Sequence, residues 1–371
     1  MLSPVLFYCL LAAAFVQVVF LLFFFLRLAF YRERNKNHNQ IQQPVSIVIC
    51  AKNEKRNLEK NLPEILNQNY PQFEVIVVND NSTDDTMDLL IDLAAQYPNL
   101  QYRNIEQESR LLLGKKYAIT VGLRAAQHEV VLLTDADTTP NSYEWIALME
   151  KKFSKGKDIV LGFSPYKKYP GFLNKCIRYE TLMAAIQYLS YTLNGLTYMG
   201  VGRNLAYRRQ LFFAYNVYVK YPELISGDDD LLINEAASGS NVSIQLDKKS
   251  FMISEPKKTW DEWYHQKRRH MSTGKYYKFK HRFFLGLFSS SHLLFYAAAL
   301  LTALYTQYPW WVVPAIVGGR FFLQAIIFYP IMRKLDQADL FILFPVMDIL
   351  YLFYYYRLMP AVFKNTVSKW K

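Results

Sequence analysis

The chain of 371 residues is poor in cysteine, and this scarcity excludes some classes of protein before any motif is considered. Only Cys9, Cys50 and Cys176 occur, far apart, so there is neither a disulfide framework nor a zinc-binding spacing. Such usage is typical of a reducing compartment. Charged residues make up 20% of the chain against 52% hydrophobic residues, which excludes an intrinsically disordered protein.

Charge is missing altogether from one long stretch near the start of the chain. Residues 5–26 contain no charged side chain. As a helix at ~1.5 Å per residue this stretch spans about 33 Å, more than the ~30 Å of a bilayer's hydrocarbon core. No basic residue precedes the stretch, whereas Arg27 follows it. This order predicts an uncleaved anchor within residues 1–30, with the following chain in the cytoplasm.

Three further apolar stretches predict a C-terminal membrane region over residues 284–371. They cover residues 284–306, 310–332 and 340–356. Asp348 interrupts the third stretch, and a charge at the bilayer centre costs ~2.5–3.5 kcal/mol. The region therefore has two or three spans, since the third stretch alternatively lies in the membrane interface.

The net charge of +12 is concentrated beside the apolar stretches. Residues 27–36 carry a net charge of +3 and residues 257–282 a net charge of +7. Positive charge next to membrane spans is typical of their cytoplasmic side. No signature of an RNA-binding or DNA-binding module accompanies it, so we expect a membrane partner and no nucleic acid.

Between the apolar ends, a polar linker at residues 31–43 leads into alternating strands and helices. The expected strands are residues 44–51, 73–78, 100–104 and 129–134, and the expected helices are residues 57–67, 84–97 and 115–126. This alternation predicts an α/β fold with a doubly wound sheet.

Polar residues follow three of these strands, at residues 52–54, 79–81 and 135–137. Ligands bind at the carboxyl ends of strands in such sheets, so the three groups should meet at one edge. Neither G-x-G-x-x-G nor G-x-x-x-x-G-K-[ST] occurs, which weighs against dinucleotide-binding and P-loop sites. Asp135 and Asp137 offer the hard oxygen ligands that suit Mg²⁺ or Mn²⁺ carrying a diphosphate. A solvated turn is the alternative, but an apolar strand precedes the pair and Asp80 ends a neighbouring strand.

The segment from residue 44 to residue 274 resembles the membrane-integrated branch of family 2 glycosyltransferases, which have the GT-A fold. This branch includes cellulose synthases, hyaluronan synthases and ceramide glucosyltransferases. Six motifs in the expected order carry the resemblance: residues 45–54, 77–84, 114–115, 135–137, 227–230 and 266–270. The resemblance implies a Rossmann-like GT-A domain over residues 44–255 and a basic interfacial segment over residues 256–283, flanked by transmembrane helices.

The resemblance also implies roles for the matched residues. The expected nucleotide-binding residues are Ala51, Asn53, Glu54, Asp80, Lys115 (with Gly114 before it) and Asp135. Asp137 is the expected metal ligand, for Mg²⁺ or Mn²⁺. Asp229 is the expected catalytic base and Asp228 the second choice, although one residue of the acidic run 228–230 alternatively just begins a helix.

The basic segment matches the family's Q-x-x-R-W element through Gln266, Arg269 and His270. In relatives this element closes over the diphosphate and the acceptor entrance. His270 stands where the family has Trp, which puts a stacking role in doubt, although Trp260 and Trp263 are near in sequence. Residues 200–207 resemble the family's acceptor-side glycine-rich loop, with a packing role as the alternative.

The implied function is that of a membrane-bound inverting glycosyltransferase with a cytoplasmic catalytic domain in a multi-pass protein. The expected donor is a nucleotide diphosphate sugar, with UDP as the expected nucleotide, and the acceptor is a lipid or a lipid-linked glycan. The alternatives are a subunit of a processive polysaccharide synthase and an inactive glycosyltransferase-like scaffold. The presence of every acidic motif weighs against the scaffold.

Overall fold

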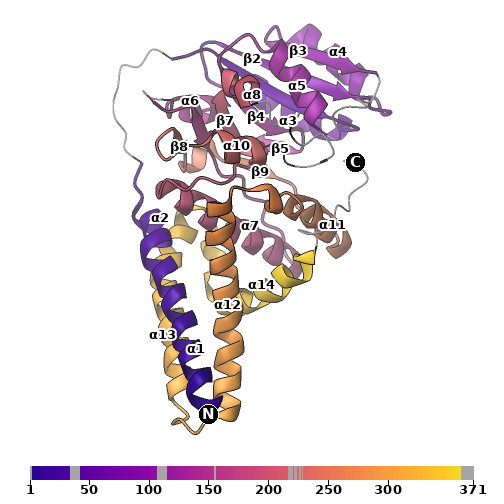
Figure 1. Cartoon of the computed structure of the whole chain (residues 1–371). Coiled ribbons are helices and arrows are strands. Elements are labelled where there is room, and N and C mark those ends of the chain that lie inside the picture. The colour runs from indigo at the N-terminus through magenta and orange to yellow at the C-terminus, as the bar shows by residue number, and fades with distance from the viewer. Residues whose placement is uncertain are drawn as a thin grey trace.

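The structure, a computed structural model, describes residues 2–33, 42–106, 115–153, 156–215, 220, 224, 227 and 229–360. Figure 1 shows three tiers: a domain built on a β-sheet, a layer that contains helices α7 and α11, and a column of long helices that includes α1, α12 and α13. The predicted α/β domain flanked by apolar helices is confirmed.

The main sheet has seven strands in the order β3-β2-β1-β4-β7-β6-β8. In that order they are Leu100–Ile105, Phe73–Asp80, Val45–Ala51, Val130–Asp135, Leu205–Arg208, Ile159–Leu161 and Val242–Ile244. Strand β7 pairs antiparallel with both β4 and β6, and every other neighbouring pair is parallel. A separate antiparallel pair consists of β5 (Thr138–Pro140) and β9 (Met252–Ser254).

Both faces of the sheet are buried, which explains the continuous apolar run of β1. Val45 and Ile47 pack into one core, and Val48 and Cys50 pack into the other. Helices α3 (Lys55–Leu66), α4 (Thr86–Gln96) and α6 (Trp145–Glu150) contribute to the first core. Helices α5 (Lys116–Ala125), α7 (Phe172–Leu193) and α10 (Asp230–Ala236) contribute to the second.

The remaining elements complete the sheet domain, lead from it to the apolar helices, and form those helices. They are η2 (Gly202–Asn204), α8 (Arg209–Tyr215), η3 (Lys248–Ser250), α11 (Trp260–Met271), η4 (Gly274–Tyr276), α12 (Phe279–Tyr305), α13 (Val312–Lys334), η5 (Ala338–Leu343) and α14 (Phe344–Leu358). At the other end, α1 (Leu2–Val19) continues through the π-helical η1 (Phe20–Phe25) into α2 (Leu26–Phe30).

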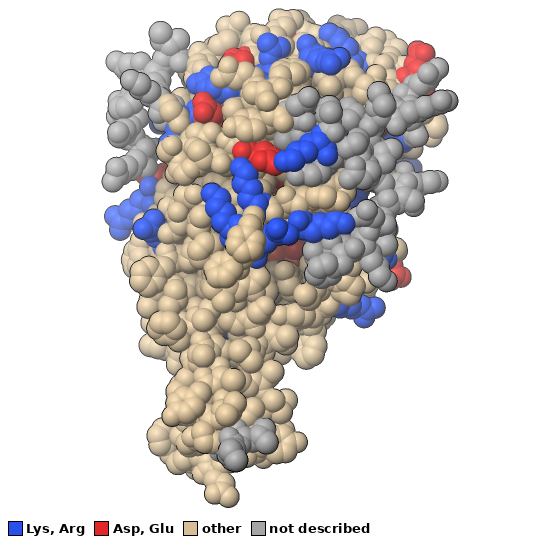
Figure 2. Space-filling view, viewed as in Figure 1, with Lys and Arg blue, Asp and Glu red and all other residues tan. Residues whose placement is uncertain are grey.

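In the part of the chain that the structure describes, four helical segments are long and apolar enough to cross a membrane: Pro4–Phe30, Phe279–Tyr305, Val312–Lys334 and Ala338–Leu358. Figure 1 shows α14 inclined away from the column that contains α1, α12 and α13. Large apolar side chains such as Phe15, Leu304 and Phe322 are exposed on these helices, as lipid contact requires. In Figure 2 the lower column shows neither Lys, Arg, Asp nor Glu, whereas basic side chains gather above it.

The apolar helices and the sheet share one hydrophobic core. Phe25 and Phe288 pack ring to ring at 5.5 Å, and Phe25 and Phe328 at 6.1 Å. These rings belong to the same buried cluster as Val48 of β1. The carboxyl-terminal edge of the sheet is therefore held at a defined position relative to the apolar helices.

A buried polar network surrounds Asp348 on α14. Its carboxylate accepts hydrogen bonds from Arg320 (2.8 Å), Tyr296 (2.7 Å) and Gln324 (3.0 Å), and it lies 3.0 Å from His292 Nε2. Asp348 is 1% exposed and Arg320 is 4% exposed. The charge that interrupts the third apolar stretch thus has a counter-charge inside the protein, which reduces its cost in a membrane.

Gln17 brings the first apolar helix into the same network. Its side-chain oxygen accepts from Arg320 at 3.1 Å, and its amide donates to Ser291 Oγ at 2.7 Å. Since α1, α12, α13 and α14 all contribute a side chain, the network fixes how these four helices face one another.

Asp348→Asn should destabilise the protein, because it leaves the Arg320 guanidinium buried without a counter-charge. Removing one partner of a buried ion pair costs roughly 3–5 kcal/mol. We expect a clearly lower midpoint of thermal unfolding in detergent, followed by intrinsic fluorescence. The double variant Arg320→Leu with Asp348→Leu should recover much of the loss. An unchanged midpoint in the single variant would show that the pair contributes nothing to stability.

Candidate active site

The polar ends of the central strands meet at one edge of the sheet, as the sequence predicts. Strand β1 lies between β2 and β4, with Ala51 opposite Asn79 and Cys50 opposite Asp135. Because all three strands run in the same direction, the residues that follow them emerge side by side.

Asn53 connects the ends of strands β1 and β2 through hydrogen bonds. Its φ of 55° is a left-handed conformation that Asn tolerates better than most residues. Its Oδ1 accepts from the Thr83 N–H at 2.7 Å, and its own N–H donates to Ser82 Oγ at 2.8 Å. The loops after β1 and β2 are therefore joined through Asn53.

A cavity of about 1130 Å³ opens beside these strand ends, between the sheet and helices α7, α11, α12 and α14. Eight of the predicted site residues line it: Glu54, Lys115, Asp135, Asp137, Asp229, Gln266, Arg269 and His270. Ala51, Asn53 and Asp80 do not line it, and their nucleotide-binding role stays a prediction. Gly114 and Asp228 lie outside the described residues.

The two carboxylates after β4 are electrostatically distinct. Asp135 forms an ion pair with Lys115. Burial acts to raise the pKa of Asp135, but the positive charges of Lys115 and Arg203 outweigh it, so the pKa lies below its usual range. Burial and the negative charge of Asp135 raise the pKa of Asp137 instead. A cation next to Asp137 would relieve this repulsion.

The donor set near Asp137 fits a cation that arrives with a diphosphate. Among the described residues, no three His, Cys, Asp or Glu side chains group closely enough to hold a metal ion by themselves. Mg²⁺ usually binds proteins through one or two carboxylates and completes its shell with water and substrate phosphates. Asp137, with Asp135 two residues away, matches that arrangement.

Arg203 adds a positive charge that sequence reasoning missed. It lies on η2, and its guanidinium carbon is 4.5 Å from the centre of the Tyr166 ring. It lines the cavity, and its Nη1 is buried with no hydrogen-bond partner among the residues that the structure describes. Such a group is available to an anionic ligand. The sequence signal was a basic residue inside the glycine-containing loop that precedes β7.

Asp229 is held in place by two backbone donors. Its Oδ2 accepts from the Gly202 N–H at 2.6 Å, and its Oδ1 accepts from the Asp230 N–H at 2.8 Å, which caps α10. The Asp230 carboxylate accepts from the hydroxyls of Thr273 and Tyr277, each at 2.6 Å. The adjacent carboxylates thus differ: Asp230 joins α10 to the segment after α11, whereas Asp229 has a fixed orientation in the cavity wall.

Helix α11 supplies the opposite, basic wall. Gln266, Arg269 and His270 are spaced i, i+3 and i+4, so they share one helical face. Desolvation beside the cavity and the charges of Lys267 and Arg269 lower the pKa of His270 well below its usual range. The buried Oε1 of Gln266 has no partner among the described residues.

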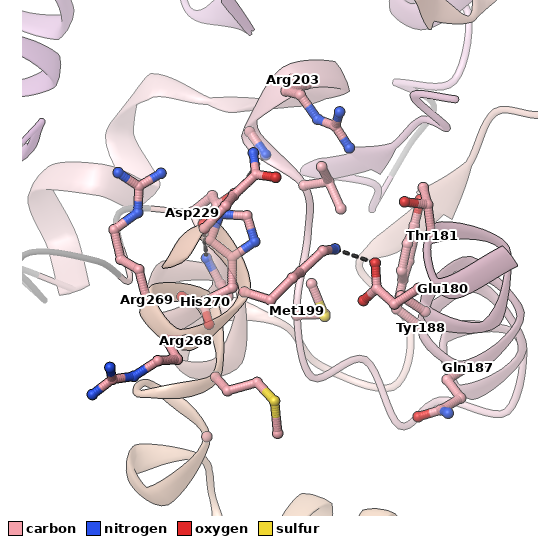
Figure 3. A pocket seen from close by; sticks show the side chains of 18 of the residues that line it. Glu180, Thr181, Gln187, Tyr188, Met199, Arg203, Asp229, Arg268, Arg269 and His270 are labelled. Carbon is pink, nitrogen blue, oxygen red and sulfur yellow. Dashed lines mark hydrogen bonds and ion pairs between the residues drawn. The ribbon is translucent and has the colours of Figure 1, made fainter. Parts of the chain in front are cut away.

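An ion pair between Lys267 and Glu180 joins α11 to α7 across the cavity. Figure 3 shows Glu180 and Tyr188 on the α7 side, and Asp229, Arg269 and His270 on the opposite side. Sequence reasoning did not identify Glu180, because its partner lies 87 residues further along the chain.

The same cavity extends to the apolar helices. Gly286 and Ser290 of α12 and Tyr351 and Tyr355 of α14 line it there. The space beside the acidic strand ends is therefore continuous with a space between two candidate membrane spans.

The two tryptophans near the basic element do not line this cavity. Trp263 is buried and stacks on Tyr354 of α14, with ring centres 4.6 Å apart and planes at 8°. Trp260 is half exposed. Neither Trp260 nor Trp263 therefore supplies a stacking surface at this site in place of the Trp that the family has at the position of His270.

A protein-family model described as Glycosyl transferase family 2 matches residues 46–214. The poly-beta-1,6-N-acetyl-D-glucosamine synthase of Staphylococcus epidermidis is 29% identical over 103 residues, which is 28% of this chain and 24% of that protein. The beta-monoglucosyldiacylglycerol synthase of Nostoc sp. is 36% identical over 95 residues, which is 25% of this chain and 20% of that protein. These matches span a quarter or less of the relatives' own length.

A solved structure supports the fold over nearly the whole chain. The mannosyltransferase PcManGT from Pyrobaculum calidifontis, in complex with GDP-Man and Mn²⁺, superposes with a TM-score of 0.60 at 18% identity. The superposition covers 94% of this chain and 99% of that one. At this identity the likeness concerns the fold alone.

Asp137→Asn should weaken binding of a divalent cation, since it removes a carboxylate whose repulsion from Asp135 a bound cation would relieve. We expect Mn²⁺ affinity in the presence of UDP to fall at least about tenfold, because even the loss of an outer-shell partner of a metal ligand costs roughly 10–100-fold. Electron paramagnetic resonance of free Mn²⁺ measures it. Asp88→Asn, an exposed change on α4, is the control. Equal Mn²⁺ affinity in both variants would exclude Asp137 as a ligand.

Proposed function

Because the chain contains a family 2 glycosyl transferase domain at residues 46–214, we propose that it is a membrane-bound inverting glycosyltransferase. It moves a sugar from a nucleoside diphosphate sugar to a lipid or a lipid-linked glycan. The observation that supports this most strongly is that Asp137, Asp229 and Arg269 line one cavity that also reaches α12 and α14.

The donor binds at the strand ends, with its diphosphate near Asp135 and Asp137. A divalent cation held by Asp137 supplies positive charge at the diphosphate when it is bound. The chain adds its own positive charges from Lys115, Arg203 and Arg269, all of which line the cavity. These charges stabilise the nucleoside diphosphate as negative charge develops on it during departure.

The acceptor hydroxyl is activated by Asp229. Its carboxylate takes the proton while the hydroxyl oxygen bonds to the anomeric carbon of the sugar. The bond from that carbon to the diphosphate oxygen breaks on the opposite side, so the anomeric configuration inverts. Each Asp229 oxygen accepts one backbone N–H, which fixes the orientation of the carboxylate.

The membrane helices position the acceptor at the cavity in this proposal. Residues of α12 and α14 line the cavity, which supports the proposal that an acceptor in the bilayer enters between these helices without leaving the membrane. We assign residues 1–30 to the N-terminal anchor, 31–43 to a linker and 44–255 to the catalytic domain. Residues 256–283 are the basic interfacial segment and residues 284–371 the C-terminal membrane region. The catalytic domain is cytoplasmic in this proposal, because basic side chains gather in Figure 2 between it and the lower column, whose face in that view shows no Lys or Arg.

UDP is the nucleotide that we propose for the donor. The named relatives make a polysaccharide and a glycolipid according to their names, and the fold neighbour holds GDP-Man and Mn²⁺. The alternative function is that of a subunit of a processive polysaccharide synthase. The length of the product distinguishes repeated transfer from a single transfer.

The reaction is tested with purified protein, a panel of nucleotide sugars and a membrane lipid extract, with products identified by mass spectrometry. We expect one glycosylated lipid species that requires a divalent cation. Asp229→Asn should lower kcat by about 10²–10⁴-fold while donor binding is kept, because only the proton acceptor is lost. Asp92→Asn, exposed on α4, is the matched control. Full activity of Asp229→Asn would reject it as the base.

Gly202→Ala should impair transfer through the position of Asp229. An added Cβ would lie 3.1 Å from Asp229 Oδ2, so the carboxylate must shift by a few tenths of an ångström. We expect kcat to fall roughly tenfold with an unchanged donor KM, since small displacements of catalytic groups cost up to ~10²-fold. The control is Gly318→Ala on α13, where an added Cβ meets nothing within 4 Å. Equal kcat in both variants would contradict this role of Gly202.

A further inference from the structure

A second cavity, of about 360 Å³, lies between α7, α11 and α14. Its lining is mainly apolar and aromatic, and includes Trp260, Trp263, Met347 and Leu350. None of these four residues lines the first cavity. A concave apolar surface of this kind suits a hydrocarbon group and offers little to a sugar or a nucleotide.

The outer edge of this cavity has the composition of a membrane interface. Phe172 and Trp260 are 53% and 50% exposed, with ring centres 6.3 Å apart. Arg357, on the last turn of α14, lies 5.4 Å from the centre of the Tyr264 ring. Aromatic rings beside a basic side chain are typical of the depth where lipid head groups meet acyl chains.

The inner edge borders the first cavity. Glu180, Tyr351 and Tyr354 line both cavities. The stack of Trp263 on Tyr354, with ring centres 4.6 Å apart, forms part of the wall between them. A molecule with an apolar chain and a polar head can therefore lie with its chain in the second cavity and its head in the first, in contact with the side chains that line both.

Three polar atoms at this junction lack partners. Tyr179 Oη, Trp263 Nε1 and Tyr354 Oη are buried and have no hydrogen bond within the described part of the chain. A buried donor without a partner is destabilising. Ester or hydroxyl oxygens of a lipid that lay across the junction would satisfy such donors.

We propose that the second cavity binds the hydrocarbon chain of the acceptor lipid, whose polar end extends past Glu180 and Tyr354 toward Asp229 in the first cavity. The inference rests on the proposed function, and it narrows the acceptor to a lipid that carries its hydroxyl near its own chain. A lipid chain is favoured over a polypeptide because the cavity lies beside a candidate membrane span and its edge matches the interface.

The test is photolabelling of the full-length protein in lipid nanodiscs. The probe is a diacylglycerol with a diazirine at the end of one acyl chain, and labelled residues are found by mass spectrometry. We expect label on Met347 and Leu350, with competition by unlabelled diacylglycerol. Phe353 is 67% exposed on the same helix, so label on it measures the non-specific background from the bilayer.

Two variants on α14 form a matched pair. Leu350→Trp fills the second cavity and should reduce label at Met347 at least fivefold, with label at Phe353 unchanged. Phe353→Trp enlarges an outward-facing side chain and should leave label at Met347 unchanged. Equal label in both variants, label that unlabelled diacylglycerol does not reduce, or a bound peptide in place of lipid would each overturn the proposal.

An activity measurement separates this proposal from the proposed function. Leu350→Trp should raise the apparent KM for the lipid acceptor at least fivefold, while the donor KM and donor hydrolysis without acceptor stay unchanged. If wild-type protein fails to turn over any nucleotide sugar, the proposed function fails, whereas the photolabelling result still decides the cavity's occupant. An acceptor KM equal to that of the wild type would reject the second cavity as the chain's site.

Discussion

The parallel pairing of β1 with β2 and β4 is the constraint on which the site depends. It collects the ends of three strands at one edge, with Cys50 opposite Asp135 in register. A parallel sheet with both faces buried leaves only its edges for polar groups. Two of the acidic residues at these strand ends, Asp135 and Asp137, therefore lie close together, where the charge of Asp135 raises the pKa of Asp137 and favours a cation.

The layer of α7, α11 and α14 adds the facing walls that make this edge one side of a cavity. Helix α11 presents Gln266, Arg269 and His270 to the cavity, and the ion pair of Lys267 with Glu180 joins it to α7. Helix α14 in turn is fixed by the contacts of Asp348 with the other apolar helices. The buried polar network of the membrane region thus supports the tyrosine-lined wall of the cavity, which lies within about two turns of Asp348 on the same helix.

Much of the architecture could be predicted from the sequence. The central strands and helices and the four apolar segments lie close to their predicted bounds, because periodicity and uninterrupted hydrophobicity are local properties. Of the predicted site residues, those after β4 and on α11 line the cavity, whereas Ala51, Asn53 and Asp80 do not. The side chain of Asn53 is used by the neighbouring loop, which no local pattern indicates.

The amino-acid sequence by itself determined the class of the fold, the apolar segments and the family motifs, since each depends on residues that lie close together in the chain. Only the tertiary structure decided that Arg203 and Glu180 line the cavity, that Asp229 rather than Asp230 has its carboxylate fixed by Gly202, and that a second apolar cavity lies beside the first. These features arise from contacts between residues far apart in the chain, and a charge or a cavity acquires its environment only when the elements around it are packed.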